Sequence, residues 1–290
     1  MEIALQSVVT GLCLGCVYAM VAIGFVLIYK ATGVINFAQG ELMMVGAYIY
    51  FTLTGSLGLP PVIALIGTVL IAGLLGALIE RLIMERIIHE APMVLILVTI
   101  GLATVLRAIT GMIWSHDTFS IAPLIPEGIV SVGSAVISYN DLSTIGATAL
   151  LCLILFLFFR YTRMGIAMRA VAQNQYAAQL MGISSKKIFM HTWALAAAIG
   201  AVGGILLAQL TYLHTHMGFI GLKAFPAVVL GGLISFPGAL LGGLIIGLAE
   251  SFSGSYIGSG AKDIVPFVIL IVVLMVRPTG FFGEPEEVRV

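Results

Sequence analysis

Long apolar stretches alternate with short polar segments along almost the whole chain. A helix needs about 20 mainly apolar residues to cross a bilayer. Apolar stretches of suitable length lie at 5–29, 34–54, 60–80, 92–114, 143–160 and 190–213, and a shorter one lies at 263–277. A further apolar region at 222–250 is interrupted by Phe236, Pro237 and Gly238, and a proline removes a helix hydrogen bond. This pattern predicts an all-α, polytopic transmembrane helix bundle with about eight spans, some of them broken or re-entrant.

Composition supports the membrane interpretation and excludes several functions. Of the 290 residues, 60% are hydrophobic and 9% are charged, whereas a soluble domain carries about 25% charged residues. The net charge of zero gives no argument for a nucleic-acid partner. The chain lacks the G-x-x-x-x-G-K-S/T motif of ATP hydrolysis and any H-E-x-x-H or G-x-S-x-G motif, so we expect no enzyme activity. His214 and His216 have no evident third ligand, so we expect no metal site.

The segment 160–187 is a basic, polar stretch between apolar spans, and it orients them. It reads RYTRMGIAMRAVAQNQYAAQLMGISSKK and holds five of the 13 lysine and arginine residues. Because short loops rich in lysine and arginine stay in the cytosol, we place this segment there. Alternation of the spans then puts Lys30, Arg81 and Arg86 on the cytosolic side as well.

The loop 115–142 is external in this orientation. It contains Asp117, Glu127 and Asp141 but no lysine or arginine, as expected for an external loop. Its alternating sequence VSVGSAVISY predicts a small β-hairpin.

The interrupted region 222–250 allows two topologies. We expect a helical hairpin that enters and leaves on the external side, which leaves Arg277 and Arg289 in the cytosol. The alternative is a single kinked span, which differs little in its distribution of positive charge.

The start of the second span carries the polar residues with the clearest functional interest. It reads GVINFAQGELMMVGAYIYF and places Asn36, Gln39, Gly40 and Glu41 in a membrane segment, where a carboxylate is costly unless paired or hydrated. We expect a glycine-broken helix start that lines the substrate pathway with free backbone N–H groups. Glu41 would then pair with Arg107. The alternatives are that Glu41 reaches water at the cytosolic end and that Arg107 snorkels to the external face.

Three blocks of sequence carry a resemblance to a known family. They are GVINFAQGELMMVGAY at 33–48, RAVAQNQYAAQLMGI at 169–183 and FPAVVLGGLISFPGALLGGLIIG at 225–247. In this order the chain resembles the branched-chain amino acid ABC transporter permeases, and it is most similar to the shorter of the two types that pair as a heterodimer. The resemblance covers nearly the whole chain and implies a single transmembrane permease domain over 1–290.

In such importers a cytosolic pattern E-A-A-x-x-x-G docks on the ATPase subunit, and the resemblance assigns this role to 160–187. The matching positions are Tyr176, Ala177, Ala178 and Gly182, so a tyrosine stands where the pattern has glutamate. We expect one helix over 164–181, with Ala170 allowing close approach and Gly182 as a left-handed cap. Arg169 is expected to pair with acidic residues of the ATPase. The alternative is an amphipathic helix that lies on the membrane surface.

The resemblance implies a transmembrane subunit of an ATP-driven importer for branched-chain or other apolar amino acids, in the bacterial inner (plasma) membrane. The implied partners are a second homologous permease, two ABC ATPase subunits, an extracytoplasmic binding protein and membrane lipid. ATP and magnesium would belong to the ATPase subunits, and this chain would hold no cofactor. Two alternatives stay open at this point. One is an ABC permease for short amides or urea, and the other is an ATPase-independent secondary transporter or channel.

Overall fold

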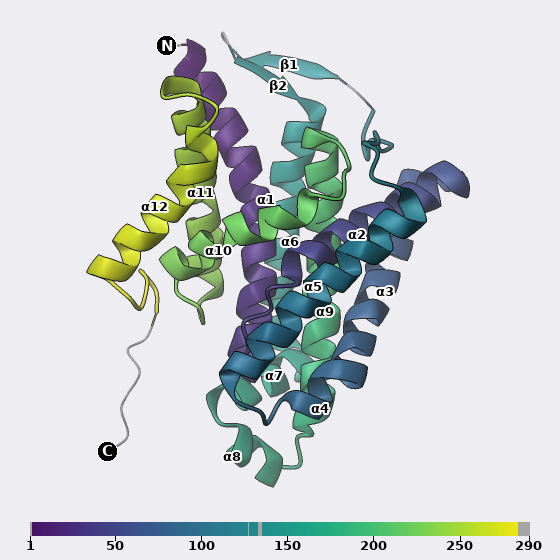
Figure 1. The fold of residues 1–290 in the computed structure, drawn as a ribbon, viewed down its shortest axis with the longest axis vertical. Helices are drawn as coiled ribbons and strands as arrows, with labels where there is room; N and C mark the ends of the chain where they lie inside the picture. The colour runs from purple at the N-terminus through teal and green to yellow at the C-terminus, as the bar shows by residue number, and fades with distance from the viewer. Residues whose placement is uncertain (1, 127, 133–134, 284–290) are drawn as a thin grey trace.

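The chain folds as a bundle of α-helices with one small β-hairpin at one end (Figure 1). The structure is a computed structural model, and it describes residues 2–126, 128–132 and 135–283. Its longer helices are α1 (Glu2–Thr32), α2 (Gln39–Phe51), α3 (Pro61–Ile79), α5 (Pro92–Trp114), α6 (Tyr139–Tyr161), α9 (Ser185–Thr211), α10 (Ile220–Gly231), α11 (Phe236–Tyr256) and α12 (Ala261–Val276). Shorter elements are the π-helical turns η1 (Thr52–Ser56) and η2 (Glu80–Met84), α4 (Glu85–Ile87), α7 (Arg163–Gln173), α8 (Gln175–Leu180) and the 3-10 turn η3 (Met217–Phe219).

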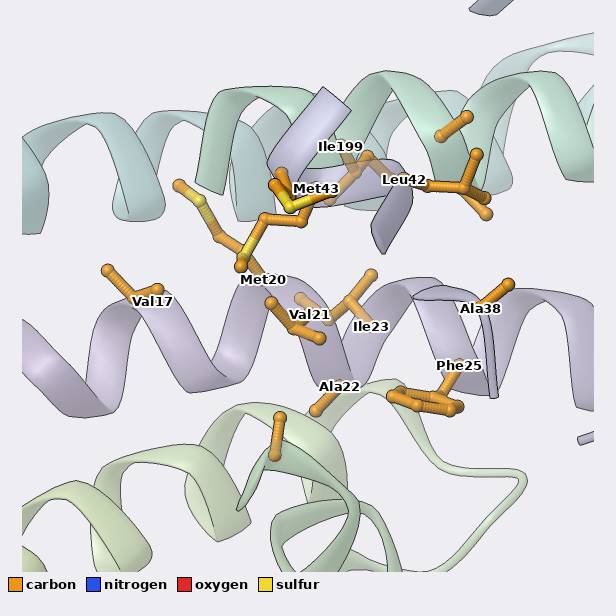
Figure 2. Packing of buried hydrophobic residues seen from close by; sticks show 14 of the residues in the cluster. Val17, Met20, Val21, Ala22, Ile23, Phe25, Ala38, Leu42, Met43 and Ile199 are labelled. Atoms are coloured by element: carbon orange, nitrogen blue, oxygen red, sulfur yellow. The ribbon is translucent and has the colours of Figure 1, made fainter. Parts of the chain in front are cut away.

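Helix α1 forms the centre of the bundle. It packs against α11, α9, α10 and α6, and 89% of its most apolar stretch is buried, against 17% for α6. Figure 2 shows Met20 of α1, Met43 of α2 and Ile199 of α9 meeting in the core. Helix α6 therefore presents most of its apolar surface outward, to lipid or to a partner chain.

Glycines allow α1 and α11 to approach each other closely. A Cβ atom on Gly247 of α11 would lie 2.4 Å from the Cα of Gly15, and one on Gly15 would lie 2.8 Å from the Cα of Leu244. Neither position has room for a side chain, because the opposing atoms belong to backbone. Small residues of the two helices thus form one seam, the kind of contact that small residues provide in membranes.

Six described helices are long and apolar enough to cross a membrane: Ile3–Thr32, Pro61–Ile87, Pro92–Trp114, Tyr139–Tyr161, Ser185–Thr211 and Phe236–Tyr256. The remaining apolar helices are shorter, with 13 residues in α2, 12 in α10 and 16 in α12. The all-α membrane bundle is confirmed, whereas about eight full spans are not. The expected span at 34–54 is shorter because the chain is not helical at 34–38.

The region 222–250 contains parts of two antiparallel helices and not one kinked span. Helix α10 ends at Gly231, the chain turns at Gly232 with φ +97°, and Ser235 caps α11 by accepting from the Gly238 N–H. At one end of α11 the Lys30 ammonium of α1 lies 5.4 Å from the Phe236 ring centroid. At the other end the Ser7 hydroxyl donates to Ser255 over 2.8 Å. The two helices of the expected hairpin are confirmed, and the turn between them lies at the basic end of the bundle, defined as the end that carries 160–187. The external side on which the hairpin begins and ends stays a prediction.

The opposite end carries the predicted β-hairpin. Strands β1 (Ile129–Val132) and β2 (Ala135–Ser138) pair antiparallel, as the alternating sequence predicts. The loop predicted to be external is shorter than expected, because α6 begins at Tyr139 with a capping box between Ser138 and Asp141. Glu127 of this loop and Arg289 of the tail lie outside the described residues.

Candidate functional site

The start of α2 lies in the middle of the bundle. Gly33 takes φ +70°, and the chain then runs non-helically until Gln39 begins α2. Asn36 and Gln39 are both fully buried. The Asn36 Oδ1 accepts from the Ala38 N–H over 3.1 Å, and the Gln39 amide donates to the Ala196 carbonyl of α9 over 3.0 Å. The Asn36 Nδ2 and the Gln39 Oε1 have no partner among the described residues.

Gly40 brings α2 into backbone contact with the start of α10. A Cβ atom on Gly40 would lie 2.0 Å from the Gly218 carbonyl oxygen and 2.9 Å from the Gly221 Cα. Both opposing atoms belong to backbone that cannot move aside independently. The four expected pathway residues Asn36, Gln39, Gly40 and Glu41 are therefore held together where α1, α2, α9 and α10 meet.

Glu41 pairs with Arg107 of α5, as the sequence predicts. Glu41 is 3% exposed, so the alternative in which it reaches water at the cytosolic end is wrong. The Arg107 guanidinium also lies 4.1 Å from the centroid of the Phe219 ring. This stacking and the ion pair hold Arg107 inside the bundle, with 29% of its side chain exposed.

A second buried charge network joins α1, α10, α11 and α12. Glu250 is 5% exposed and accepts from the Tyr18 hydroxyl over 2.5 Å and from the Lys223 ammonium over 3.1 Å. Lys223 also contacts Asp263 of α12 over 2.6 Å. The sequence analysis missed this network, because Tyr18 and Glu250 are 232 residues apart. A lysine and a glutamate inside apolar helices were the signal that could have revealed it.

The segment 160–187 forms two helices where one was expected. Helices α7 and α8 are separated at Asn174, whose backbone is extended at φ −156° and ψ 100°. Its side-chain oxygen accepts from the Ala177 N–H over 2.9 Å and caps α8. Asparagine favours such local hydrogen bonds over a continuous helix, which explains the break. The expected left-handed conformation at Gly182 is confirmed, with φ +82°.

A small hydrophobic cluster anchors this segment to the bundle. Its buried members are Met168, Val171, Ala178, Ile188 and Phe189. Lys186 adds an ion pair of 2.8 Å to Glu85 of α4. Ala178 thus packs inward, Ala170 is half-buried and packs against the cluster, and Ala177 is exposed.

The outer surface of α8 is apolar and exposed. Tyr176 is 71% exposed, Leu180 is 71% exposed and Met181 is 83% exposed. Leu180 and Met181 were missed in the sequence analysis because the docking pattern leaves those positions unspecified. Arg169 is also exposed, but it lies on α7 and lines a groove beside Lys30 and Phe236.

His214 and His216 lie in the loop between α9 and α10. Burial, and secondly the nearby His216, lower the pKa of His214 below its ordinary value, which favours the neutral ring at neutral pH. No group of three or more histidine, cysteine, aspartate or glutamate side chains is placed to hold a metal within the described parts of the chain.

Comparisons with known proteins agree with this architecture. The profile of the family described as "Branched-chain amino acid transport system / permease component" matches residues 7–274. The high-affinity branched-chain amino acid transport permease LivH of Salmonella typhimurium is 36% identical, over 99% of this chain and 97% of that protein. BraD of Pseudomonas aeruginosa, described in the same terms, is 37% identical, over 99% and 98%.

A solved structure shares the fold. The structure of PsaBC from Streptococcus pneumoniae in complex with Fab matches with a TM-score of 0.51 and 15% identity, over 97% of this chain and 94% of that chain. The similar proteins and the six long apolar helices make this chain a multi-pass protein of the inner membrane. The extent of the family match and the identity to these permeases show that the chain belongs to the permease components of branched-chain amino acid transport systems.

Proposed function

We propose that this chain is a transmembrane subunit of an ATP-driven importer for branched-chain or other apolar amino acids. The named relatives are described as high-affinity transporters of branched-chain amino acids. The complex would contain a second homologous permease, two ATPase subunits and an extracytoplasmic binding protein. ATP and magnesium would bind to the ATPase subunits, and this chain would carry out no hydrolysis and hold no cofactor.

The exposed apolar surface of α8 is the observation that supports this function most directly. Tyr176 and Leu180 lie on the short helix α8 at the basic end, and Met181 directly follows its last residue; each is more than two-thirds exposed. Exposed apolar patches bordered by polar residues mark protein interaction sites. We therefore assign α8 and Gly182 as the surface that an ATPase subunit grips, with Arg169 and Ala170 of α7 beside it. The tyrosine at 176 would supply an aromatic anchor in place of a carboxylate.

Motion of the ATPase would reach the membrane through the packing of this segment. Ala178 of α8 belongs to one buried cluster with Met168 and Val171 of α7 and with Ile188 and Phe189 of α9. Because packed side chains resist compression, a displacement of α8 would move α7 and the start of α9 as one body. Helix α9 contacts α2 and α1, so this movement would reach the start of α2. The pathway there would then open in turn to the two sides of the membrane.

The start of α2 is the proposed substrate pathway. It contains two buried polar groups, the Asn36 Nδ2 and the Gln39 Oε1, that have no partner in the part of the chain that the structure describes. Unpaired buried polar groups are costly, and they persist where a ligand or water completes them. We assign Asn36, Gln39, Gly40 and Glu41 to this pathway, with the amide groups offered to the polar end of the amino acid.

Uptake into proteoliposomes tests the proposed function. The chain is reconstituted with its second permease and its ATPase subunits, with the binding protein and labelled leucine outside and ATP inside. Accumulation of leucine should require both ATP and the binding protein. Uptake that continues without ATP, driven by a proton gradient, would contradict the proposal and favour a secondary transporter.

A further inference from the structure

A wide apolar cavity opens between α6 and α11 at the basic end. Its volume is about 530 Å³, and its lining includes Leu155, Phe156 and Phe159 of α6 and Leu240 of α11. Ligand clefts in proteins typically measure about 300–1,000 Å³. A second cavity of about 230 Å³ shares Cys152 and Leu240 with the first and has an apolar lining that extends further along α6. The two cavities together form an apolar track along α6 and α11.

Two arginines border this track where it meets the basic end. Arg160 of α6 and Arg169 of α7 both line the larger cavity, and both side chains are exposed. Neither forms an ion pair with a carboxylate in the described parts of the chain. Arg160 lies near its own aromatic neighbours, 5.7 Å from the Phe156 ring centroid and 5.6 Å from that of Tyr161.

A more polar cavity continues from Arg169 toward the cytosol. Its volume is about 810 Å³, and its lining includes Lys30, Thr32, Ser235 and Gln173. The lining residues of this cavity include no aspartate or glutamate. The three cavities therefore offer an apolar track, then an arginine pair, then a polar and cationic opening.

We propose that these cavities bind one anionic phospholipid of the cytosolic leaflet, with an acyl chain between α6 and α11 and the phosphate on Arg160 and Arg169. Guanidinium groups bind phosphate oxygens in a bidentate manner. The cytosolic leaflet carries anionic lipids, and basic pockets between transmembrane helices recognise their headgroups. Charge complementarity selects a lipid over a partner helix, because a helix of ordinary apolar composition would leave both arginines without a counter-charge.

The position of the site gives the lipid a structural role. It would join α6 and α7 to α11 at the point where the α10–α11 turn meets the segment 160–187. Helix α6 contacts α1 and α7, and it touches α11 through Phe159, whose ring stacks on Phe236 with centroids 4.9 Å apart; the cavity opens beside this contact. An occupied site would thus extend the packing between α6 and α11 beyond this aromatic contact.

Native mass spectrometry of the delipidated transporter complex tests this site, with phosphatidylglycerol titrated as the anionic probe. Arg160→Gln should weaken phosphatidylglycerol binding about five-fold, the effect of one basic residue near a lipid surface. Arg163→Gln is the matched control, because Arg163 is exposed on the same segment but does not line the cavity, and it should leave binding unchanged. Arg160 is the better test residue because Arg169 also belongs to the proposed docking segment.

Three further measurements make the test specific. Phosphatidylcholine with the same acyl chains should bind less tightly to the wild type and be insensitive to Arg160→Gln. Free glycerol phosphate should not displace the lipid, which distinguishes a bound phospholipid from a simple anion. Leu240→Trp should fill the apolar track and abolish retention while both arginines remain, with complex assembly checked by size exclusion.

Equal binding of the two lipids, or equal binding by the wild type and Arg160→Gln, would overturn the proposal. So would a wild-type complex that binds no phosphatidylglycerol, the result expected if a helix of the second permease fills the cavity. The binding experiment measures lipid binding and not transport. The lipid-site proposal can therefore fail while leucine uptake still requires ATP, as the proposed function predicts.

Discussion

The Glu41–Arg107 ion pair joins α2 to α5 within the apolar bundle. Glu41 is 4% exposed at its side chain, whereas Arg107 is 29% exposed. The two partners therefore differ in what their loss leaves behind. Removing the arginine leaves a buried carboxylate without a counter-charge, whereas removing the glutamate leaves a cation that is partly solvated and stacked on Phe219.

We predict that Arg107→Gln destabilises the protein more than Glu41→Gln does. Breaking a buried ion pair by removing one partner costs about 3–5 kcal/mol, and only the arginine variant approaches this value. Thermal unfolding of the two variants in detergent gives the order directly. A larger loss of stability for Glu41→Gln than for Arg107→Gln would contradict this prediction, because it would show that the unpaired arginine is the more costly of the two groups.

Gly40 gives a second prediction at the residue scale. Gly40→Ala would place a methyl group against the Gly218 carbonyl, and overpacking of this kind costs about 1–3 kcal/mol. The control is Gly101→Ala in α5, where nothing lies within 4 Å and alanine favours the helix. Leucine uptake and melting temperature should fall for the first variant and be unchanged or higher for the second.

The polar contacts inside the bundle differ in how well the sequence alone predicts them. The Glu41–Arg107 pair was predictable, because each is an isolated charge in an apolar span and each needs a partner. The incomplete hydrogen bonding of the buried Asn36 and Gln39 amides was not, because burial and partners depend on how α1, α2 and α9 pack. The Tyr18–Glu250–Lys223 network was missed for the same reason, since its members come from three helices.

At the scale of elements, α8 depends on its cap. Asn174→Ala removes the acceptor for the Ala177 N–H, and loss of an N-cap costs about 0.5–2 kcal/mol. We expect faster hydrogen exchange over 175–180, because a helix of six residues has few other contacts. Asn174→Asp keeps the acceptor and should exchange like the wild type. Unchanged exchange in Asn174→Ala would mean that α8 is held by packing alone.

The Lys223 network ties α10 to α11 and α12. Lys223→Met would leave Glu250 buried with only the Tyr18 hydroxyl as partner, so we predict a loss of several kcal/mol. Asp263→Asn should have little effect, because Asp263 is 74% exposed. Thermal unfolding and protease cleavage between α11 and α12 measure the two variants. An equal loss of stability in Lys223→Met and Asp263→Asn would contradict the prediction, because it would mean that Lys223 stabilises the protein mainly through its ion pair with Asp263.

Element boundaries were predictable only where length decides them. Apolar stretches near 60–80 and 92–114 became the long helices α3 and α5, because a membrane span leaves few other structures for such stretches. The short α2 and the split between α7 and α8 depend on local hydrogen bonds of Asn36 and Asn174. The pattern of apolar residues does not report these bonds.

At the scale of the whole molecule, the membrane class and family follow from the sequence, whereas the assembly surfaces do not. Composition and the three sequence blocks at 33–48, 169–183 and 225–247 were sufficient for the class and family. The exposed patch of Tyr176, Leu180 and Met181 required the structure, since only the packing of Ala178 inward shows which side of α8 faces out. This patch connects the fold to the proposed ATP-driven cycle.

Photo-crosslinking from α8 in the assembled transporter tests that connection most directly. Benzoylphenylalanine is placed at Tyr176 or at Met181, and at Tyr256 as an exposed aromatic control at the opposite end of the bundle. We predict crosslinks to the ATPase subunit from positions 176 and 181 and none from position 256. A complex that retains its ATPase but yields no crosslink from either α8 position would contradict the account.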